Sequence, residues 1–168
     1  MSLYLKNQRN RMKTNTMKKV LIALDYNPTA QKVAEDGFAM AKAMNAEICL
    51  LHVGIDLWMY SSIYPNMGIW QIDSTNVIDE YNEANKGSHN FLEKAKKHLG
   101  DASIQIIQKE GDAVQMILQT SDEIKADCIV MGSHSQKWLE NILIGSVAEE
   151  VLRKTTIPLF VVPTKKKG

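Results

Sequence analysis

Two glycines and a serine in the C-terminal part of the chain lie where a predicted strand ends and a predicted helix begins. Gly132 directly follows an apolar run, where a missing side chain lets the backbone approach a ligand or adopt a positive φ. Gly145 and Ser146 open a predicted helix, and the unpaired N–H groups and positive dipole end of a helix attract anions. The same residue types also make ordinary helix caps, so phosphate binding and capping are both open on this pattern alone.

Asp25 is the second candidate, because it follows the buried-type run at 20–24. A carboxylate there could accept hydrogen bonds from both hydroxyls of a ribose, or it could cap a helix beginning near Thr29. His134 lies beside Ser133, but Ser–His catalysis also needs an orienting acid and an oxyanion site, and neither can be assigned. We therefore expect no catalytic residue, and we expect His52, within an apolar run, to be a buried histidine with a satisfied hydrogen bond.

The elements that must position these residues alternate along the chain. Apolar runs predict strands, and apolar residues at three- and four-residue steps predict helices. Strands are expected at 20–24, 48–53, 103–109, 128–131 and 157–162, and helices at 29–45, 77–99, 113–125 and 146–154. This order predicts one α/β domain, a doubly wound parallel sheet of five strands with helices on both faces. Ligands of such sheets bind beyond the carboxyl ends of the strands.

Two local features refine this outline. Asp112 and Gln115 form a capping-box-like start for the helix at 113–125. Residues 54–76 show no regular period and contain several aromatic side chains, so we expect a long loop there. The loop could be a lid or an interface patch, or it could simply cover part of the core.

Length and composition suit a single globular domain. The chain has 168 residues and a net charge of +1, but the basic residues gather at its two ends. Without the nine at 1–19 and 165–167, eleven basic and nineteen acidic residues remain, a net charge of −8, which argues against nucleic-acid binding. We expect residues 1–16 to be a disordered basic extension, 17–164 to be the domain, and 165–168 to be a basic tail.

The sequence also allows predictions about the cellular compartment and about metal binding. It shows no apolar run long enough to span a membrane and no signal peptide, so we expect a cytoplasmic protein without a membrane partner. Cys49 and Cys128 lie in apolar runs without metal-ligand spacing, so we expect two buried thiols in a reducing compartment and no metal site.

The stretch from 132 to 162, GSHSQKWLENILIGSVAEEVLRKTTIPLFVV, resembles the universal stress protein family. Nucleotide-binding members of that family carry the motif G-x2-G-x9-G-(S/T). Gly132, Gly145 and Ser146 match the motif, the nine-residue spacer is kept, and Ser135 replaces the second glycine. The resemblance covers nearly all of 17–164, including KKVLIALDYNPTAQKVAEDGFAMAKAMNAEICLLHV and EGDAVQMILQTSDEIKADCIVMGSHS.

This resemblance implies a sheet in strand order 3-2-1-4-5 that binds ATP, ADP or AMP at its carboxyl edge, where Mg2+ could accompany the triphosphate. We expect a stress-response protein that regulates through binding, with slow ATP hydrolysis at most, because the sequence offers no committed base, no arginine near the phosphates and no dedicated metal cluster. The alternative is a nucleotide-free dimeric interaction protein that uses its aromatic loop and dimer surface. Carried over by position, the nucleotide site consists of Ala23, Asp25, Val53, Met131, Gly132, Ser135, Gly145, Ser146 and Val147.

Two further expectations concern the motif and the last strand. If the replaced glycine serves a positive φ, Ser135 costs roughly 1–2 kcal/mol there, and ATP should gain little over ADP. In the implied strand order, residues 157–162 form a sheet edge with alternating large apolar side chains. Such an edge invites another chain, so we expect a homodimer through this strand.

Overall fold

The computed structural model describes residues 17–54, 74–133 and 145–164. Its helices and strands alternate along the chain, as the apolar patterns predict. In chain order they are β1 (Lys19–Ala23), α2 (Ala30–Ala43), β2 (Glu47–Gly54), α4 (Ser74–Leu99), β3 (Gln105–Glu110), α5 (Ala113–Glu123), β4 (Cys128–Gly132), α6 (Ser146–Lys154) and β5 (Leu159–Val162).

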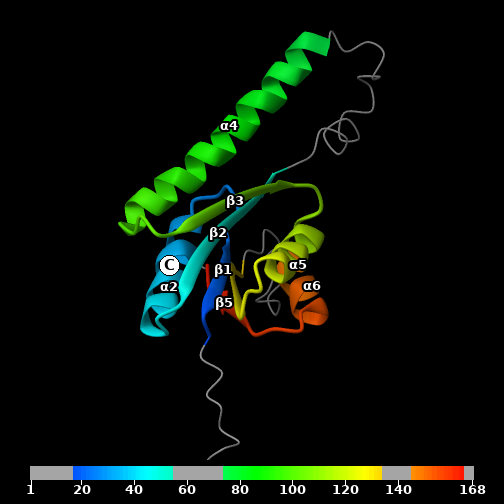
Figure 1. Ribbon diagram of the computed structural model, residues 1–168. Helices are drawn as coiled ribbons and strands as arrows, with labels where there is room; N and C mark the ends of the chain where they lie inside the picture. The colour runs from blue at the N-terminus through cyan, green and yellow to red at the C-terminus, as the bar shows by residue number, and fades with distance from the viewer. Residues whose placement is uncertain (1–16, 55–73, 134–144, 165–168) are drawn as a thin grey trace, which may run out of the picture.

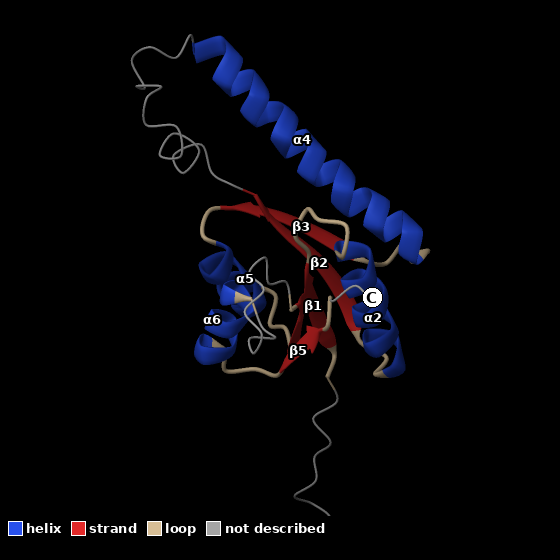
Figure 2. Cartoon of the chain, turned by 180° about the vertical axis from the view of Figure 1, so that it is seen from behind, coloured by secondary structure: helices blue, strands red, loops and turns tan. Residues whose placement is uncertain are grey.

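The five strands form one sheet in the order β3-β2-β1-β4-β5, and every neighbouring pair is parallel. The predicted α/β fold class and strand order are therefore confirmed. Helices α2 and α4 lie on one face, and α5 and α6 lie on the other (Figures 1 and 2). The C-terminal half of α4 lies along the sheet, whereas its N-terminal half continues past the sheet (Figure 1).

Each face of the sheet buries its own apolar cluster. On the α2–α4 face, the fully buried side chains include Val20, Ile22 and Leu92. On the α5–α6 face they include Leu21, Ile129 and Val151. The alternation of Val20, Leu21 and Ile22 between the two clusters is what the two-residue period of a strand produces, so β1 is buried on both faces.

Gly37 sets how closely α2 approaches the sheet. A Cβ atom at this position would lie 2.9 Å from Ile22 Cδ1 and 3.1 Å from Val130 Cγ1. Both neighbours are buried branched side chains of central strands, so they cannot move aside easily. A glycine is therefore required here for the helix to pack against β1 and β4.

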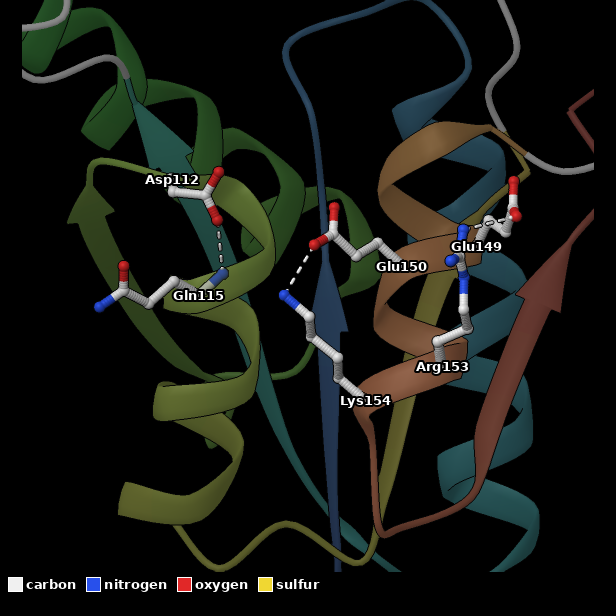
Figure 3. Close-up of polar contacts among 6 residues, drawn as sticks. All are labelled: Asp112, Gln115, Glu149, Glu150, Arg153 and Lys154. Carbon is white, nitrogen blue, oxygen red and sulfur yellow. Dashed lines mark hydrogen bonds and ion pairs between the residues drawn. The ribbon is translucent and has the colours of Figure 1, made fainter.

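The helix ends are closed by local hydrogen bonds. The N–H of Gln115 donates to Asp112 Oδ1 at 2.8 Å, which confirms the predicted cap of α5 (Figure 3). On α6, Arg153 pairs with Glu149 and Lys154 pairs with Glu150, one helical turn apart (Figure 3). These exposed pairs stabilise the helix only modestly.

Several element boundaries differ by one to three residues from those predicted, among them the starts of α4, β3 and β5. α4 begins at Ser74, so the last three residues of the expected 54–76 loop are helical. β5 begins at Leu159 rather than at 157. Thr155 Oγ1 accepts from the N–H of Ile157, which holds that residue in a turn, and Pro158 has no N–H to donate.

The remaining predictions about segments concern residues 1–16, 55–73 and 165–168, which lie outside the described residues. Within the described part of the chain, no helix is long and apolar enough to cross a membrane. Cys49 and Cys128 are both buried and free, as predicted.

Candidate functional site

The candidate site lies at the carboxyl edge of the sheet, between two neighbouring strands that are followed by helices on opposite faces. β1 and β4 are neighbours, with Ala23 paired to Met131 near their ends. β1 leads into α2 on one face, and the next described helix after β4 is α6 on the opposite face (Figures 1 and 2). Open α/β sheets bind ligands at such a switch point, in the crevice outside the carboxyl ends of the strands.

Four of the predicted site residues form an apolar wall on the α5–α6 face. Ala23, Val53 and Val147 are partly buried, Met131 is buried, and all four belong to one cluster. They come from β1, β2, β4 and the first turn of α6. The structure therefore brings residues that lie up to 124 positions apart in the sequence into one apolar cluster.

Asp25 follows β1 after one residue and is exposed. Its carboxylate makes no hydrogen bond or ion pair to any residue that the structure describes. The turn into α2 is closed instead by Asn27 Oδ1, which accepts from the N–H of Thr29 at 2.7 Å and from its hydroxyl at 2.6 Å. Asp25 therefore does not cap α2, and its carboxylate is free to bind a ligand.

The start of α6 supplies backbone donors at the same edge. Gly145 is the buried N-cap, with φ −70° and ψ 159°, and no side chain caps the helix among the described residues. Its carbonyl accepts from the N–H of Glu149 at 2.9 Å, as in a regular first turn. The N–H groups of Ser146, Val147 and Ala148 have no acceptor within the helix, and Ser146 is exposed, so an anion could bind them.

The residues just after β4 are held by the last strand. Gly132 pairs with Val162, and the N–H of Ser133 donates to the Val162 carbonyl at 2.9 Å. Ser133 Oγ accepts from the N–H of Thr164 at 3.1 Å. The Ser133 hydroxyl thus joins the ends of β4 and β5, a role that sequence reasoning missed, while His134 and Ser135 lie outside the described residues.

His52 contacts the chain segment that carries Asp25. The residue is 7% exposed, and Nδ1 lies 2.8 Å from the Leu24 carbonyl oxygen, which confirms the prediction of a satisfied buried histidine. Tyr26 and Phe91 lie beside it, with ring centroids 5.1 Å apart in an edge-on arrangement. Sequence reasoning missed this aromatic contact, although Phe91 falls on the apolar face of its helix.

The two thiols do not take part in the site. Burial raises the pKa of Cys49 to about 11, although Lys19 opposes the shift, and burial also raises the pKa of Cys128. Because a thiolate is the reactive form, neither cysteine is a nucleophile at neutral pH. No group of three His, Cys, Asp or Glu side chains suited to a metal ion occurs among the residues that the structure describes.

Taken together, the switch point offers an apolar wall, a free carboxylate and a helix N-terminus. These are the groups that a base, a ribose and a phosphate respectively require.

Comparison with known proteins identifies the family to which this α/β protein belongs. The family model described as "Universal stress protein family" matches residues 16–163. Universal stress protein MJ0531 of Methanocaldococcus jannaschii is 31% identical over 166 residues, which cover 98% of this chain and 92% of that protein. The chain therefore belongs to the universal stress protein family.

Two solved structures share the fold. The protein MJ0577 superposes with a TM-score of 0.69 and 28% identity, covering 90% of this chain and 99% of that one. A universal stress protein crystallised in complex with cAMP has a TM-score of 0.59 and 20% identity, covering 90% of this chain and all of that one.

Proposed function

We propose that this chain binds an adenine nucleotide at the carboxyl edge of its sheet and acts as a regulatory binding module in a stress response. The observation that carries the proposal is the switch point between β1 and β4. There the uncommitted carboxylate of Asp25 follows one strand, and α6 opens at Gly145 after the other. The cAMP complex of a protein with the same fold supports the choice of an adenine nucleotide.

Each residue has a defined part in this proposal. The base packs against Ala23, Val53 and Met131, and Asp25 accepts hydrogen bonds from the ribose hydroxyls. The phosphates bind the N–H groups at Ser146 and Val147, with backbone contributions at three further positions, Gly132, Ser135 and Gly145. ATP, ADP and AMP all fit these roles, and a Mg2+ ion would be held by the phosphates and water, because no described residue is assigned to it.

The proposal includes no catalytic residue and slow ATP hydrolysis at most. Asp25 binds the ribose, far along the nucleotide from the phosphates, and the phosphates contact only backbone groups and one hydroxyl. We place the protein in the cytoplasm, since both cysteines are free thiols, as is usual in a reducing compartment.

Replacing Ser146 by alanine tests the phosphate end of the site. The variant removes one hydroxyl from the phosphate, so the ATP dissociation constant should rise about 5- to 30-fold, or roughly 1–2 kcal/mol. Adenosine affinity should hardly change. Isothermal titration calorimetry measures both, with Thr156→Ala, at the other end of α6, as the control variant.

Equal losses for ATP and adenosine would show that the phosphates do not lie at α6. If the parent protein binds no adenine nucleotide even at about millimolar concentration, the free energy of binding is weaker than about −4 kcal/mol and the nucleotide proposal fails. The alternative, a nucleotide-free interaction protein that uses its dimer surface and the aromatic segment at 54–76, would then replace it.

We further propose a homodimer through β5. Among the residues that the structure describes, this strand lies at one edge of the sheet with no strand beside its outer N–H and C=O groups, and Phe160 is 42% exposed. Two copies can pair antiparallel across a two-fold axis and bury both phenyl rings. Phe160→Lys would place a charge in that interface, so sedimentation equilibrium should show weaker association than for the surface variant Lys97→Glu. A parent protein that stays monomeric at micromolar concentration would disprove the dimer.

A further inference from the structure

The loop between β1 and α2 is fixed at nearly every residue. The Leu24 N–H donates to the Leu51 carbonyl at 2.8 Å, and the Leu24 carbonyl accepts from His52 Nδ1 at 2.8 Å. The Asp25 carbonyl in turn accepts from the N–H of Asn27 at 2.8 Å. Because a peptide unit is planar, fixing the carbonyl of Leu24 also fixes the N–H and Cα of the next residue. The backbone of Asp25 is therefore held from both sides.

Side-chain contacts also hold the loop between β1 and α2 in place. The Tyr26 ring meets the Phe91 ring of α4 edge-on at 5.1 Å, and Phe91 in turn lies 5.6 Å from the His52 ring. Tyr26 is nevertheless 71% exposed, so burial alone does not hold it in place. The Asn27 side chain already accepts hydrogen bonds from Thr29. The charged side chain of Asp25, by contrast, has no partner among the described residues.

The tautomer of His52 follows from its contact. A carbonyl oxygen only accepts, so the hydrogen must lie on Nδ1, and this donor is directed at the segment that precedes Asp25. The ring is almost fully enclosed on the α2–α4 face, whereas the apolar wall of the candidate site lies on the opposite face. His52 therefore does not face a ligand of that wall, and its side-chain hydrogen bond connects it to the loop that carries Asp25.

We infer that His52 is a positioning residue: through the Leu24 carbonyl, and with Phe91 as a second anchor, it presents the Asp25 carboxylate to the ribose hydroxyls of the nucleotide. The inference rests on the proposed function and adds to it the residues that hold the site ready. With the backbone of Asp25 already held, only its side chain has to become ordered on binding, so a preorganised loop raises affinity without touching the ligand.

Two substitutions of His52 separate positioning from packing. In His52→Asn the amide nitrogen takes the place of Nδ1 and can still donate to Leu24. In His52→Gln the amide lies one carbon further out and cannot occupy that place. Both variants are polar and smaller than histidine, so each is the matched control for the other, and their melting temperatures show whether both fold.

Two ligands then report on Asp25. ATP carries both ribose hydroxyls, and 2′,3′-dideoxy-ATP lacks them. Calorimetry should show His52→Gln binding ATP about fivefold more weakly than the parent, equivalent to about 1 kcal/mol for a neutral hydrogen bond. His52→Asn should stay within about twofold, or about 0.4 kcal/mol. For the dideoxy nucleotide all three proteins should bind alike, because nothing is left for Asp25 to recognise.

Phe91→Leu provides an independent variant, since it keeps an apolar side chain in α4 but removes the edge-on contact with Tyr26. It should weaken ATP binding and leave the dideoxy nucleotide unaffected, as His52→Gln does. Equal losses for the Asn and Gln variants, equal losses for both nucleotides, or no loss at all would overturn the inference. Failure of the parent protein to bind ATP would instead overturn the proposed function, so the two failures are distinguishable.

Discussion

Two buried polar side chains, those of His52 and Thr120, differ in whether their polar atoms form hydrogen bonds. His52 is almost fully enclosed, but its Nδ1 donates to a backbone carbonyl, so its burial leaves that group satisfied. Thr120 of α5 is fully buried, and its hydroxyl has no hydrogen-bond partner among the residues that the structure describes. Because a hydroxyl loses its water contacts on burial, the unpaired one destabilises the folded state.

Replacing Thr120 by valine should therefore stabilise the protein. The change substitutes a methyl group for the unpaired hydroxyl and keeps the branched shape, so the free energy of unfolding should rise by about 1–2 kcal/mol. Urea unfolding measures this as a higher midpoint with an unchanged slope. Thr120→Ala removes the same hydroxyl but also leaves a cavity, so it should be less stable than the valine variant. A valine variant less stable than the parent would show that the hydroxyl is paired.

Site residues that lie at the end of a strand or at the start of a helix could be predicted from the sequence alone. Asp25 and Gly132 follow apolar strands and Ser146 opens a helix, so each could be placed at the carboxyl edge of the sheet before the structure was known. The contacts of His52 with Leu24 and of Ser133 with Thr164 join residues 28 and 31 positions apart. Both depend on the register between strands, which residue types and local spacing do not specify.

At the scale of elements, α2 and α5 end in the same way. The N–H of Ala46 donates to Ala41 O and that of Asn45 to Lys42 O, and the equivalent bonds follow α5. In both turns the residue after the C-cap has φ of 53°, in the left-handed region that usually takes glycine. Here the residues are Asn45 and Lys125.

Lys125→Gly should stabilise the protein for this reason. A side chain in the left-handed region is strained, and glycine removes the strain at some loss of chain entropy, so we expect a net gain of about 0.5–1 kcal/mol. Asn45→Gly is the matched control, because asparagine tolerates this conformation and should gain less. Thermal unfolding of both variants measures the difference. A lysine variant that gains no more than the asparagine one would mean that strain at position 125 is negligible.

Element types were more predictable than element ends. Every predicted strand and helix is present, because each buries a periodic or continuous apolar run. β5 begins two residues later than its apolar run, since Ile157 is as apolar as the strand but is held in a turn by Thr155. α4 begins three residues before its apolar period, because Ser74, Thr75 and Asn76 are helical but polar.

For the molecule as a whole, ion pairs and hydrogen bonds connect elements that the sheet does not join. Asp101, in the turn after α4, accepts from Lys42 Nζ of α2 at 2.9 Å and from the N–H of Ser103 at 2.9 Å. Hydrogen bonds from Ser103, and then the contact with Lys42, hold the pKa of this carboxyl well below its usual value of 3.8. His98 of α4 and Glu35 of α2 pair at 2.7 Å on the same side of the sheet.

Because its pKa is lowered in the folded protein, Asp101 makes the stability of the fold decrease at acid pH. Its ionised form stabilises the folded state above the unfolded pKa, and this contribution is lost progressively as the pH falls from about 5 to about 2. Asp101→Asn should therefore be less stable than the parent at neutral pH, and the gap should narrow as the solution is acidified. Urea unfolding at a series of pH values measures it. Asp36→Asn, which breaks an exposed pair with Lys32 within α2, is the control. A gap for Asp101→Asn that is constant over this pH range would show that its carboxyl titrates alike in the folded and unfolded chains.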